Sequence, residues 1–387
     1  MASFKNKIEY ILKHNLFIQK TYKSVFSLVF KTIGFFVKTN PNLVLINSFG
    51  GRRYNDSSRT VYERIRTNSD LNHLTIVWAF EKPEEFDIPS KKVKIDTLQY
   101  FLTALKAKYW ISNVNIERGL HFKKKQTRYL NTWHGIPLKL VGNAVSGRKD
   151  FKFSDIDIFC YSGSFEKDIY QRDFGVKKES MVMCGLPRND ELYNMDKSRI
   201  NQLRNRYNIP DGKKVILYAP TWRESSDKGK SYGIKPPLDV NSLEKELGNE
   251  YVLIIRMHHF TTQLMDIEFN DFIRDGSSIQ NINELLIISD VLISDYSATI
   301  FDYAILERPI ISFAYDYDEY KKSRGFYFDL AKELPGGIIK TQEELVKKIQ
   351  TINFKKECLK TATFKNKYLQ AGGKATDICI NLLFNLK

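Results

Sequence analysis

Short apolar runs alternate with amphipathic helical stretches along most of this chain. Each run has the length and aliphatic composition of a strand that is buried on both faces. The runs are Leu43–Phe49, Leu74–Phe80, Val93–Asp96, Tyr109–Ser112, Tyr129–Trp133, Ile156–Ser162, Met181–Gly185, Val215–Ala219, Val252–Met257, Val291–Ser294 and Ile310–Ala314. Strands that alternate with helices are typical of βα units, so the pattern predicts an α/β fold with mostly parallel sheets.

The alternation stops in a polar helical region near residues 190–210 and then restarts. Two consecutive α/β domains are the simplest architecture, and we assign them to 39–195 and 196–345. Residues 346–387 are predicted to form carboxy-terminal helices. In such sheets ligands bind beyond the carboxyl ends of the strands, here in the cleft between the domains. The run 223–237 is rich in Ser, Lys and Gly, which predicts a mobile loop.

Residues 1–38 are predicted to form a basic amphipathic helical segment. Apolar side chains repeat at helical spacing along one face: Ile18, Tyr22, Val25, Val29, Ile33 and Phe36. Such a helix is suited to lie in the surface of an anionic membrane. The alternative is a helix that packs on its own domain. No run spans a bilayer, since Ser24–Val37 is short and is interrupted by Lys31.

The charge balance points to an anionic partner. Sixty basic residues against 45 acidic ones give a net charge of +15 over 387 residues. Nucleic acid, a phosphorylated molecule or polymer, and an anionic membrane all fit this charge. The sequence contains no zinc-finger or RNA-recognition signature, so charge alone argues for nucleic acid and we expect none to bind.

The four cysteines are scattered and have no metal-ligand spacing. Cys160 and Cys184 fall inside apolar strand-like runs, which predicts buried free thiols. Free thiols fit a reducing cytoplasm.

The segment Ser289–Asp302 changes from a strand into a helix. Its apolar run ends in a group of polar residues at the expected start of the helix: Ser294, Asp295, Tyr296, Ser297 and Thr299. A helix N-terminus offers unpaired N–H groups and a positive dipole end, which favour phosphate. A helix cap without a ligand is the alternative, because Ser, Thr and Asp are preferred there in any case.

Other polar clusters also follow strands, and three of the six histidines fall within them. An imidazole titrates near neutrality, so it can take a proton from a hydroxyl nucleophile. Arg223 and Arg256 stand beside these clusters and can neutralise phosphate as bidentate donors. The sequence has no Walker loop, no GxGxxG motif and no GxSxG elbow, so it supports neither a P-loop enzyme nor a serine hydrolase.

Taken in order, these blocks resemble the CDP-glycerol glycerophosphotransferase family of teichoic-acid synthesis. The matching segments are Asn131-Thr132-Trp133-His134-Gly135-Ile136-Pro137-Leu138-Lys139, Tyr161-Ser162-Gly163-Ser164-Phe165, Cys184-Gly185-Leu186-Pro187-Arg188-Asn189-Asp190, Leu217-Tyr218-Ala219-Pro220-Thr221-Trp222-Arg223, Arg256-Met257-His258, Ser294-Asp295-Tyr296-Ser297, Phe301-Asp302 and Arg324-Gly325-Phe326-Tyr327-Phe328-Asp329. The resemblance implies a GT-B-like pair of Rossmann-type domains with the donor nucleotide held mainly by the second. It also implies a peripheral protein at the cytoplasmic face of the membrane.

The resemblance further implies attack by an acceptor hydroxyl on the β-phosphorus of CDP-glycerol, with release of CMP. His134 matches the family's proposed base and His258 its second essential histidine, while His259 stands where many members have proline. The acceptor would be a saccharide or glycerophosphate chain linked to undecaprenyl diphosphate. No tightly bound cofactor is expected, and Mg²⁺ would enter only with the donor pyrophosphate.

We therefore divide the candidate residues into three groups. The catalytic group is His134, His258 and Arg256; the donor- or phosphate-binding group is Thr221, Arg223, Ser294, Asp295, Ser297, Thr299 and Asp302; the acceptor-side group is Gly135, Lys139, Ser162, Gly163 and Asp56. No metal ligands are assigned. The alternatives are a transferase for CDP-ribitol or another polyol phosphate, a GT-B glycosyltransferase, and a non-catalytic module that binds anionic polymer or membrane.

Overall fold

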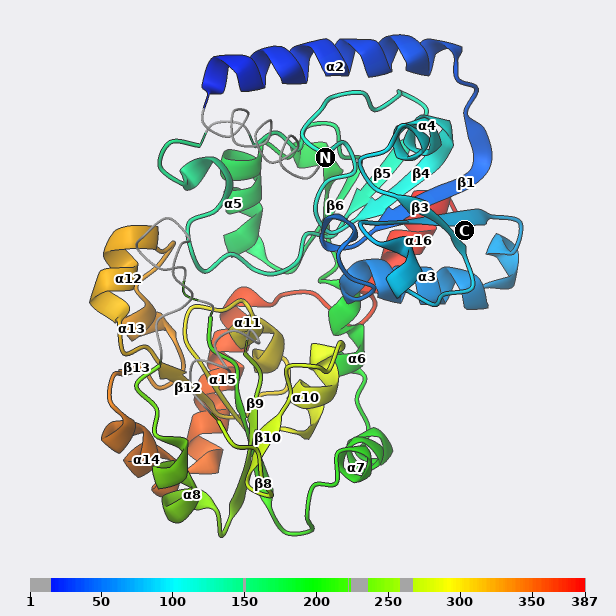
Figure 1. The fold of residues 1–387 in the computed structure, drawn as a ribbon. Coiled ribbons are helices and arrows are strands. Elements are labelled where there is room, and N and C mark those ends of the chain that lie inside the picture. The colour runs from blue at the N-terminus through cyan, green and yellow to red at the C-terminus, as the bar shows by residue number, and fades with distance from the viewer. Residues whose placement is uncertain (1–14, 149–150, 222, 224–235, 258–266, 387) are drawn as a thin grey trace.

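Two parallel β-sheets form the framework of the protein (Figure 1). The computed structural model describes residues 15–148, 151–221, 223, 236–257 and 267–386. The first sheet has seven strands in the order β3-β2-β1-β4-β5-β6-β7, and the second has six in the order β10-β9-β8-β11-β12-β13. The prediction of an α/β fold with parallel sheets is confirmed.

The first domain contains β1 Asn40–Asn47, β2 Thr75–Phe80, β3 Lys91–Lys94, β4 Ala107–Ser112, β5 Arg128–Asn131, β6 Ile158–Tyr161 and β7 Met181–Met183. Its main helices are α3 Asp56–Thr67, α4 Leu98–Lys106 and α5 Ser164–Phe174, and the short 3₁₀ turns η1 Phe49–Gly51 and η6 Pro187–Asn189 lie at strand ends. The helices α6 Asp190–Tyr193 and α7 Lys197–Arg206 lead to the second domain.

The second domain contains β8 Lys214–Tyr218, β9 Tyr251–Ile255, β10 Ile273–Asp275, β11 Val291–Ser294, β12 Ile310–Phe313 and β13 Ile338–Ile339. Its helices are α8 Val240–Leu247, α10 Ile282–Ile288, α11 Thr299–Ala304, α12 Tyr317–Arg324, α13 Leu330–Glu333 and α14 Gln342–Gln350. Residues 224–235 of the predicted loop lie outside the described residues.

Each sheet separates two hydrophobic cores because successive side chains of a strand point to opposite faces. In β1, Leu43 and Leu45 join one core of the first domain, whereas Val44 and Ile46 join the other. Both faces of the strand are therefore buried, as its unbroken aliphatic sequence predicts.

The carboxy-terminal helices are divided between the two domains. α15 (Phe354–Tyr368) adds Phe364 and Tyr368 to a core of the second domain. The chain then crosses back, and α16 (Ala375–Phe384) adds Cys379, Ile380 and Leu383 to a core of the first. In Figure 1 the red α16 lies beside the blue α3. The two domains are thus joined twice, through residues near 190–210 and again after α15.

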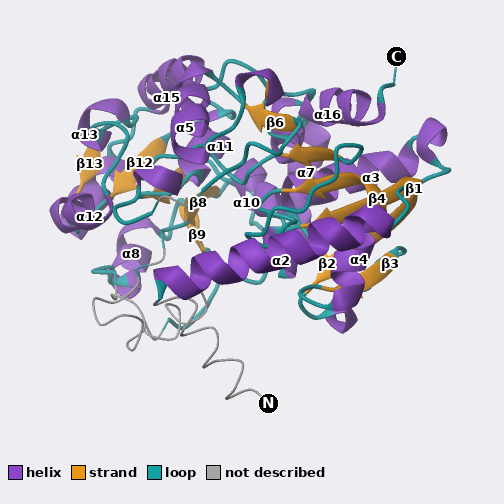
Figure 2. Cartoon of the chain, turned by 90° about the horizontal axis from the view of Figure 1, so that it is seen from above, coloured by secondary structure: helices purple, strands orange, loops and turns teal. Residues whose placement is uncertain are grey.

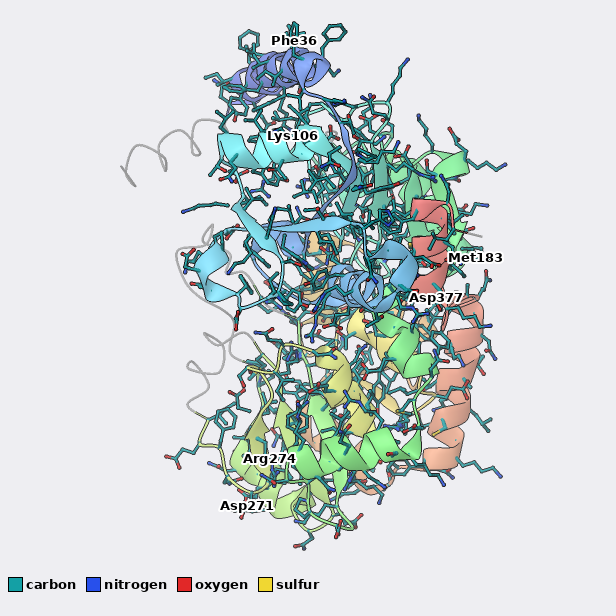
Figure 3. The ribbon with its side chains drawn as sticks, turned by 90° about the vertical axis from the view of Figure 1, so that its right-hand side faces the viewer. Phe36, Lys106, Met183, Asp271, Arg274 and Asp377 are labelled. Carbon is teal, nitrogen blue, oxygen red and sulfur yellow. The ribbon has the colours of Figure 1, made fainter. Side chains whose placement is uncertain are left out.

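α2 (Leu16–Phe36) lies across the first domain (Figure 2). It packs through the buried Ser27, Phe30 and Gly34 and the half-buried Ile33, and the Phe30 ring stacks on Phe101 of α4 at 4.3 Å between centroids. Other apolar side chains of the helix are exposed to solvent: Phe17, Ile18, Tyr22, Val25, Phe26, Leu28, Val29, Phe35 and Phe36. Figure 3 shows Phe36 projecting away from the domain. Within the described residues, none of the helices has the length and apolar character needed to cross a membrane.

Candidate active site

The loops that follow β1, β4 and β5 are tied together at the carboxyl edge of the first sheet. Ser112 at the end of β4 donates its Oγ–H to Asn47 Oδ1 of β1 at 2.6 Å. The next residue, Asn113, accepts the Phe49 N–H at 2.8 Å through Oδ1. In the loop after β5, the Trp133 N–H donates to Asn131 Oδ1 at 2.8 Å. These side chains fix the positions of Phe49 and His134.

His134 is held in one tautomer. Its Nδ1 lies 2.9 Å from the Asn113 carbonyl oxygen, and because a carbonyl oxygen only accepts, Nδ1 carries the proton. In the neutral ring Nε2 therefore keeps its lone pair. The ring lies against Trp133 and Phe49, with centroid distances of 4.0 and 5.4 Å. Burial lowers the pKa of His134, so the imidazole is neutral at pH 7 and is able to accept a proton.

The turn that carries His134 touches the second domain. Gly135 has φ +151°, and a Cβ added there would lie 2.7 Å from the Cβ of Ala298, just before α11. The Tyr170 hydroxyl of α5 donates to the Gly135 carbonyl oxygen at 3.1 Å and lies 3.2 Å from Glu166. Burial raises the pKa of Glu166 to about 7. The first-domain histidine and the start of α11 thus meet through a contact that only glycine permits.

Arg188 joins three segments through buried ion pairs. Its Nη1 lies 2.8 Å from Asp56 Oδ2 at the start of α3, and its Nη2 lies 2.8 Å from Asp302 Oδ2 on α11. Asn189 adds a hydrogen bond of 2.7 Å from its side-chain amide to Asp302. Both carboxylates are therefore occupied as partners of Arg188. Their predicted roles on the donor and acceptor sides stay predictions.

A cavity of about 540 Å³ is lined by residues of both domains. The lining residues of the first domain and of the segment that leaves it are Phe49, Arg53, Asn55, Asp56, Arg59, Thr60, Glu63, Arg188, Glu191 and Arg199. Those of the second domain are Arg256, Gln280, Asn281, Ile282, Asn283 and Glu284. Phe49 lines this cavity and also contacts the His134 ring. The base candidate therefore lies next to the cavity wall.

Arg53 and Arg256 bring two positive charges to this cavity. Arg256 Nη1 donates to the carbonyl oxygens of Gly276, at 2.8 Å, and Ile279. Burial, together with the positive charge of Arg53, lowers the pKa of Arg256 to about 10. Within the described residues, neither guanidinium forms an ion pair with a carboxylate. Two neighbouring cations that form no ion pair with a described carboxylate favour an anion between them.

Several predicted donor-side residues hold one another instead of facing the cavity. Ser294 donates to the Ala219 carbonyl oxygen at 2.7 Å, and Asp295 accepts the Thr221 N–H at 2.8 Å. The buried Arg223 lies 2.9 Å from Asp295 and 2.7 Å from Asp316. Since two carboxylates already neutralise Arg223, its geometry favours a structural role for this residue over a contact with phosphate.

Three hydroxyls of the donor-side group remain available. Thr221 Oγ1 is buried and has no hydrogen-bond partner among the described residues. Ser297 and Thr299 are half-buried at the start of α11, where Ser297 Oγ accepts the Thr299 N–H at 3.2 Å. Ser297 Oγ also donates to Thr299 Oγ1 at 3.0 Å. These groups fit the predicted contacts with phosphate oxygens, which stay a prediction.

Other predicted residues lie at contacts between segments and do not line the cavity. Lys139 forms an isolated β-bridge with Phe326. The Ser162 carbonyl oxygen accepts the Gln370 N–H at 2.8 Å, and a Cβ on Gly163 would lie 2.3 Å from the Tyr368 carbonyl oxygen. The predicted catalytic His258, like His259, lies outside the described residues.

Sequence reasoning missed the roles of Arg53, Asn113 and Arg188. Arg188 lies in the family-like segment Cys184–Asp190, but nothing in its local sequence indicates that its ion-pair partners are Asp56 and Asp302. Arg53 lies in the segment Gly50–Ser58, whose position after a strand predicts a contact with the acceptor. Nothing in that segment indicates that Arg53 lines a cavity together with Arg256.

Comparison with known proteins decides the family. The family model described as CDP-glycerol:poly(glycerophosphate) glycerophosphotransferase matches residues 29–385. The chain belongs to this glycerophosphotransferase family. The resemblance stated from the sequence is confirmed, and so is the prediction of a transferase of teichoic-acid and cell-wall synthesis.

Curated relatives of this chain are teichoic-acid enzymes. It is 34% identical over 372 residues to the teichoic acid glycerol-phosphate transferase of Staphylococcus aureus, with 90% of each chain covered. It is 35% identical over 369 residues to the teichoic acid poly(glycerol phosphate) polymerase of Bacillus subtilis, covering 90% of this chain and 48% of that protein. The chain thus spans about half the length of that polymerase.

The fold of this chain is similar to that of the wall teichoic acid polymerase TagF. One TagF structure superposes with a TM-score of 0.82 at 31% identity and covers 99% of this chain and 97% of that chain. A TagF variant soaked with CDPG has a TM-score of 0.80 at 30% identity, with 95% and 96% covered.

The glycine contact with α11 gives a first test. Gly135→Ala should lower the free energy of unfolding by roughly 1–3 kcal/mol, because the new methyl group collides with Ala298 and the backbone is strained. Urea denaturation measures this change. Gly147→Ala is the matched control, since Gly147 also has a positive φ but has open space around it. Equal losses in both variants would mean that the contact with Ala298 contributes nothing.

Proposed function

We propose that this family member transfers glycerol phosphate from CDP-glycerol to a hydroxyl group of a lipid-linked acceptor and releases CMP. One observation carries the proposal. The neutral His134, with Nε2 unprotonated, contacts Phe49 in the wall of a cavity where Arg53 and Arg256 form no ion pair with a carboxylate of the described residues. A base beside two such cations is what attack by a hydroxyl group on a diphosphate requires.

The proposed step begins with the acceptor hydroxyl near His134. Nε2 accepts its proton while the hydroxyl oxygen forms a bond to the β-phosphorus of CDP-glycerol. The bond from that phosphorus to the bridging oxygen breaks, and CMP leaves with the electron pair. The product is a phosphodiester, and the imidazolium returns its proton to solvent. Phosphoryl-type transfer depends mainly on alignment and on stabilisation of charge, so the protein needs no covalent intermediate.

The charge on the diphosphate would be balanced from both domains. Arg53 approaches from the loop after β1, and Arg256 approaches from the end of β9. The Thr221 hydroxyl, which has no partner among the described residues, and the Thr299 hydroxyl, which accepts from Ser297, would add donors on the second-domain side. His258 at the pyrophosphate remains a proposal from the family resemblance. Mg²⁺, where present, would be bound by the pyrophosphate oxygens.

The exposed face of α2 supports a membrane location for the acceptor reaction. Phe17, Phe35 and Phe36 are 79%, 85% and 79% exposed, so these rings contribute little to the fold. Lys20 and Lys31 are also exposed on the same helix. Aromatic side chains beside lysines favour the surface of an anionic bilayer. This face supports our proposal of a peripheral protein at the membrane. The cytoplasmic face and the undecaprenyl-diphosphate-linked acceptor are proposed from the family resemblance.

The reaction can be tested by following CMP release from CDP-glycerol with a membrane acceptor. His134→Ala should lower the rate by roughly 10²–10⁴, because proton removal in the transition state is lost. In the wild type, activity should fall as the pH drops below the lowered pKa of His134, since protonation of Nε2 removes the base.

His73→Ala is the matched control, because His73 is exposed and lies outside the cavity lining. An unchanged rate in His134→Ala would exclude the base. Release of CMP from CDP-ribitol alone would assign a different polyol donor, and binding of polymer without any turnover would favour the non-catalytic alternative.

The paired arginines can be tested separately. Arg53→Gln should lower kcat/KM for CDP-glycerol by roughly 10- to 100-fold, because a charge-assisted hydrogen bond to phosphate contributes about 1.5–3 kcal/mol. Steady-state kinetics measure the loss. Arg66→Gln on α3 is the control, since Arg66 is exposed and does not line the cavity. Equal kinetics for the two variants would remove Arg53 from the site.

The membrane surface can be tested by vesicle sedimentation. Replacing Leu28, Phe35 and Phe36 together by serine should lower the partitioning of the protein onto phosphatidylglycerol vesicles at least about 10-fold, since each buried apolar side chain contributes about 1.5–3 kcal/mol. Leu359→Ser is the control for exposed apolar surface elsewhere, because Leu359 is 63% exposed on α15. Undiminished binding of the triple variant would rule out this face of α2.

A further inference from the structure

Three of the four cysteines meet in the first domain although they are far apart in the sequence. Cys160 lies on β6, Cys184 follows β7, and Cys379 lies on α16. The sulfur atoms of all three lie within 4.8 Å of one another, and those of Cys160 and Cys379 are 3.2 Å apart. The sequence predicted isolated buried thiols at Cys160 and Cys184. Their burial is confirmed, but the return of α16 to the first domain makes them neighbours of a third thiol.

The spacing of these sulfur atoms suits a single metal ion. With zinc–sulfur bonds of about 2.3 Å, three thiolates around one ion are separated by roughly 3.8–4.0 Å. The printed 3.2 Å between Cys160 and Cys379 is shorter than this value, and all three separations are at most 4.8 Å, so small side-chain rotations would bring the three sulfurs to it. The fourth cysteine, Cys358, is half-buried on α15 and does not belong to the group.

The surroundings of the three thiols are apolar and dry. Ile158, Leu186, Ala375 and Ile380 belong to the same core. Such an environment excludes water and disfavours hard cations that need oxygen ligands. Thiolate sulfur selects soft d¹⁰ cations such as Zn²⁺ and Cu⁺.

We propose that Cys160, Cys184 and Cys379 form a structural site for one thiophilic d¹⁰ metal ion, Zn²⁺ or Cu⁺. Binding replaces thiol protons by the metal: with Zn²⁺, three thiols release three protons and leave a complex of charge −1. No electrons are transferred. Three sulfurs alone suit trigonal Cu⁺, whereas Zn²⁺ would take a fourth ligand, for which the nearby Gly185 carbonyl oxygen, 3.4 Å from the Cys184 sulfur, is available.

The site would connect the carboxy-terminal helix to the Arg188 segment. Cys184 stands four positions before Arg188, and Asp190 accepts the Ala375 and Thr376 N–H groups at the start of α16, at 3.0 and 2.8 Å. A metal ion bound by Cys379 of α16 and by Cys184 after β7 would hold these two segments together. Loss of the metal ion should therefore lower the free energy of unfolding, because a ligand that binds only the folded state stabilises it.

The test uses the full chain, unfolded with chelator and reductant and refolded with Zn²⁺, with Cu⁺ under anaerobic conditions, or without metal. We expect one ion per chain after gel filtration and a Tm at least about 4 °C above that of the metal-free protein. Comparison of the protein refolded with Zn²⁺ and with Cu⁺ identifies which ion is retained. X-ray absorption of the wild type should show three sulfur neighbours at about 2.3 Å, a result that requires no variant.

Cys379→Ser should lower the affinity for the metal at least about 10-fold, whereas Cys358→Ser should leave it unchanged. Three results would overturn the proposal: no retained ion in either arm, an ion with nitrogen or oxygen neighbours in place of the three sulfurs, or equal binding by both variants. A disulfide between Cys160 and Cys379 in freshly isolated protein would overturn it as well, because it consumes two of the three ligands.

Discussion

The buried charge of Arg188 is the constraint on which the two-domain arrangement depends. Its guanidinium is shared between Asp56 of the first domain and Asp302 of the second. A charge removed from water is tolerated only when its partners are in place, and removal of one partner from such a group typically costs about 3–5 kcal/mol. Arg188, Asp56 and Asp302 therefore determine the relative position of the two domains. Their contribution to the overall free energy of unfolding is the smaller effect.

The arrangement of the His134 turn follows from this fixed junction. Asn113 sets the tautomer, Gly135 allows the approach to Ala298, and Tyr170 anchors the carbonyl group of the same turn. Each contact comes from a different element, so the base is positioned by the fold as a whole. The same junction leaves Arg53 and Arg256 facing a common cavity without carboxylate partners among the described residues.

The sheets could be predicted because buried parallel strands have uninterrupted aliphatic sequences. β10 and β13 escaped prediction because Ile273–Asp275 and Ile338–Ile339 are too short to form a recognisable run. The packed face of α2 was also missed: Ile33, predicted on the membrane-facing side, packs on the first domain with Phe30, and the neighbouring Ser27 and Gly34 give no apolar signal. Strand-end positions identified His134 and Arg256, but ion pairs such as those of Arg188 and Arg223 depend on tertiary neighbours that no local pattern contains.

The double crossing of the chain restricts how the two halves of the molecule can move. One polypeptide connection leaves the first half after β7, and a second returns between α15 and α16. Two chain connections between the same two domains permit rotation about the line that joins the connections. They resist twisting and separation of the domains. Any change in the angle between the halves would then have to break or carry along the ion pairs of Arg188 with Asp56 and Asp302.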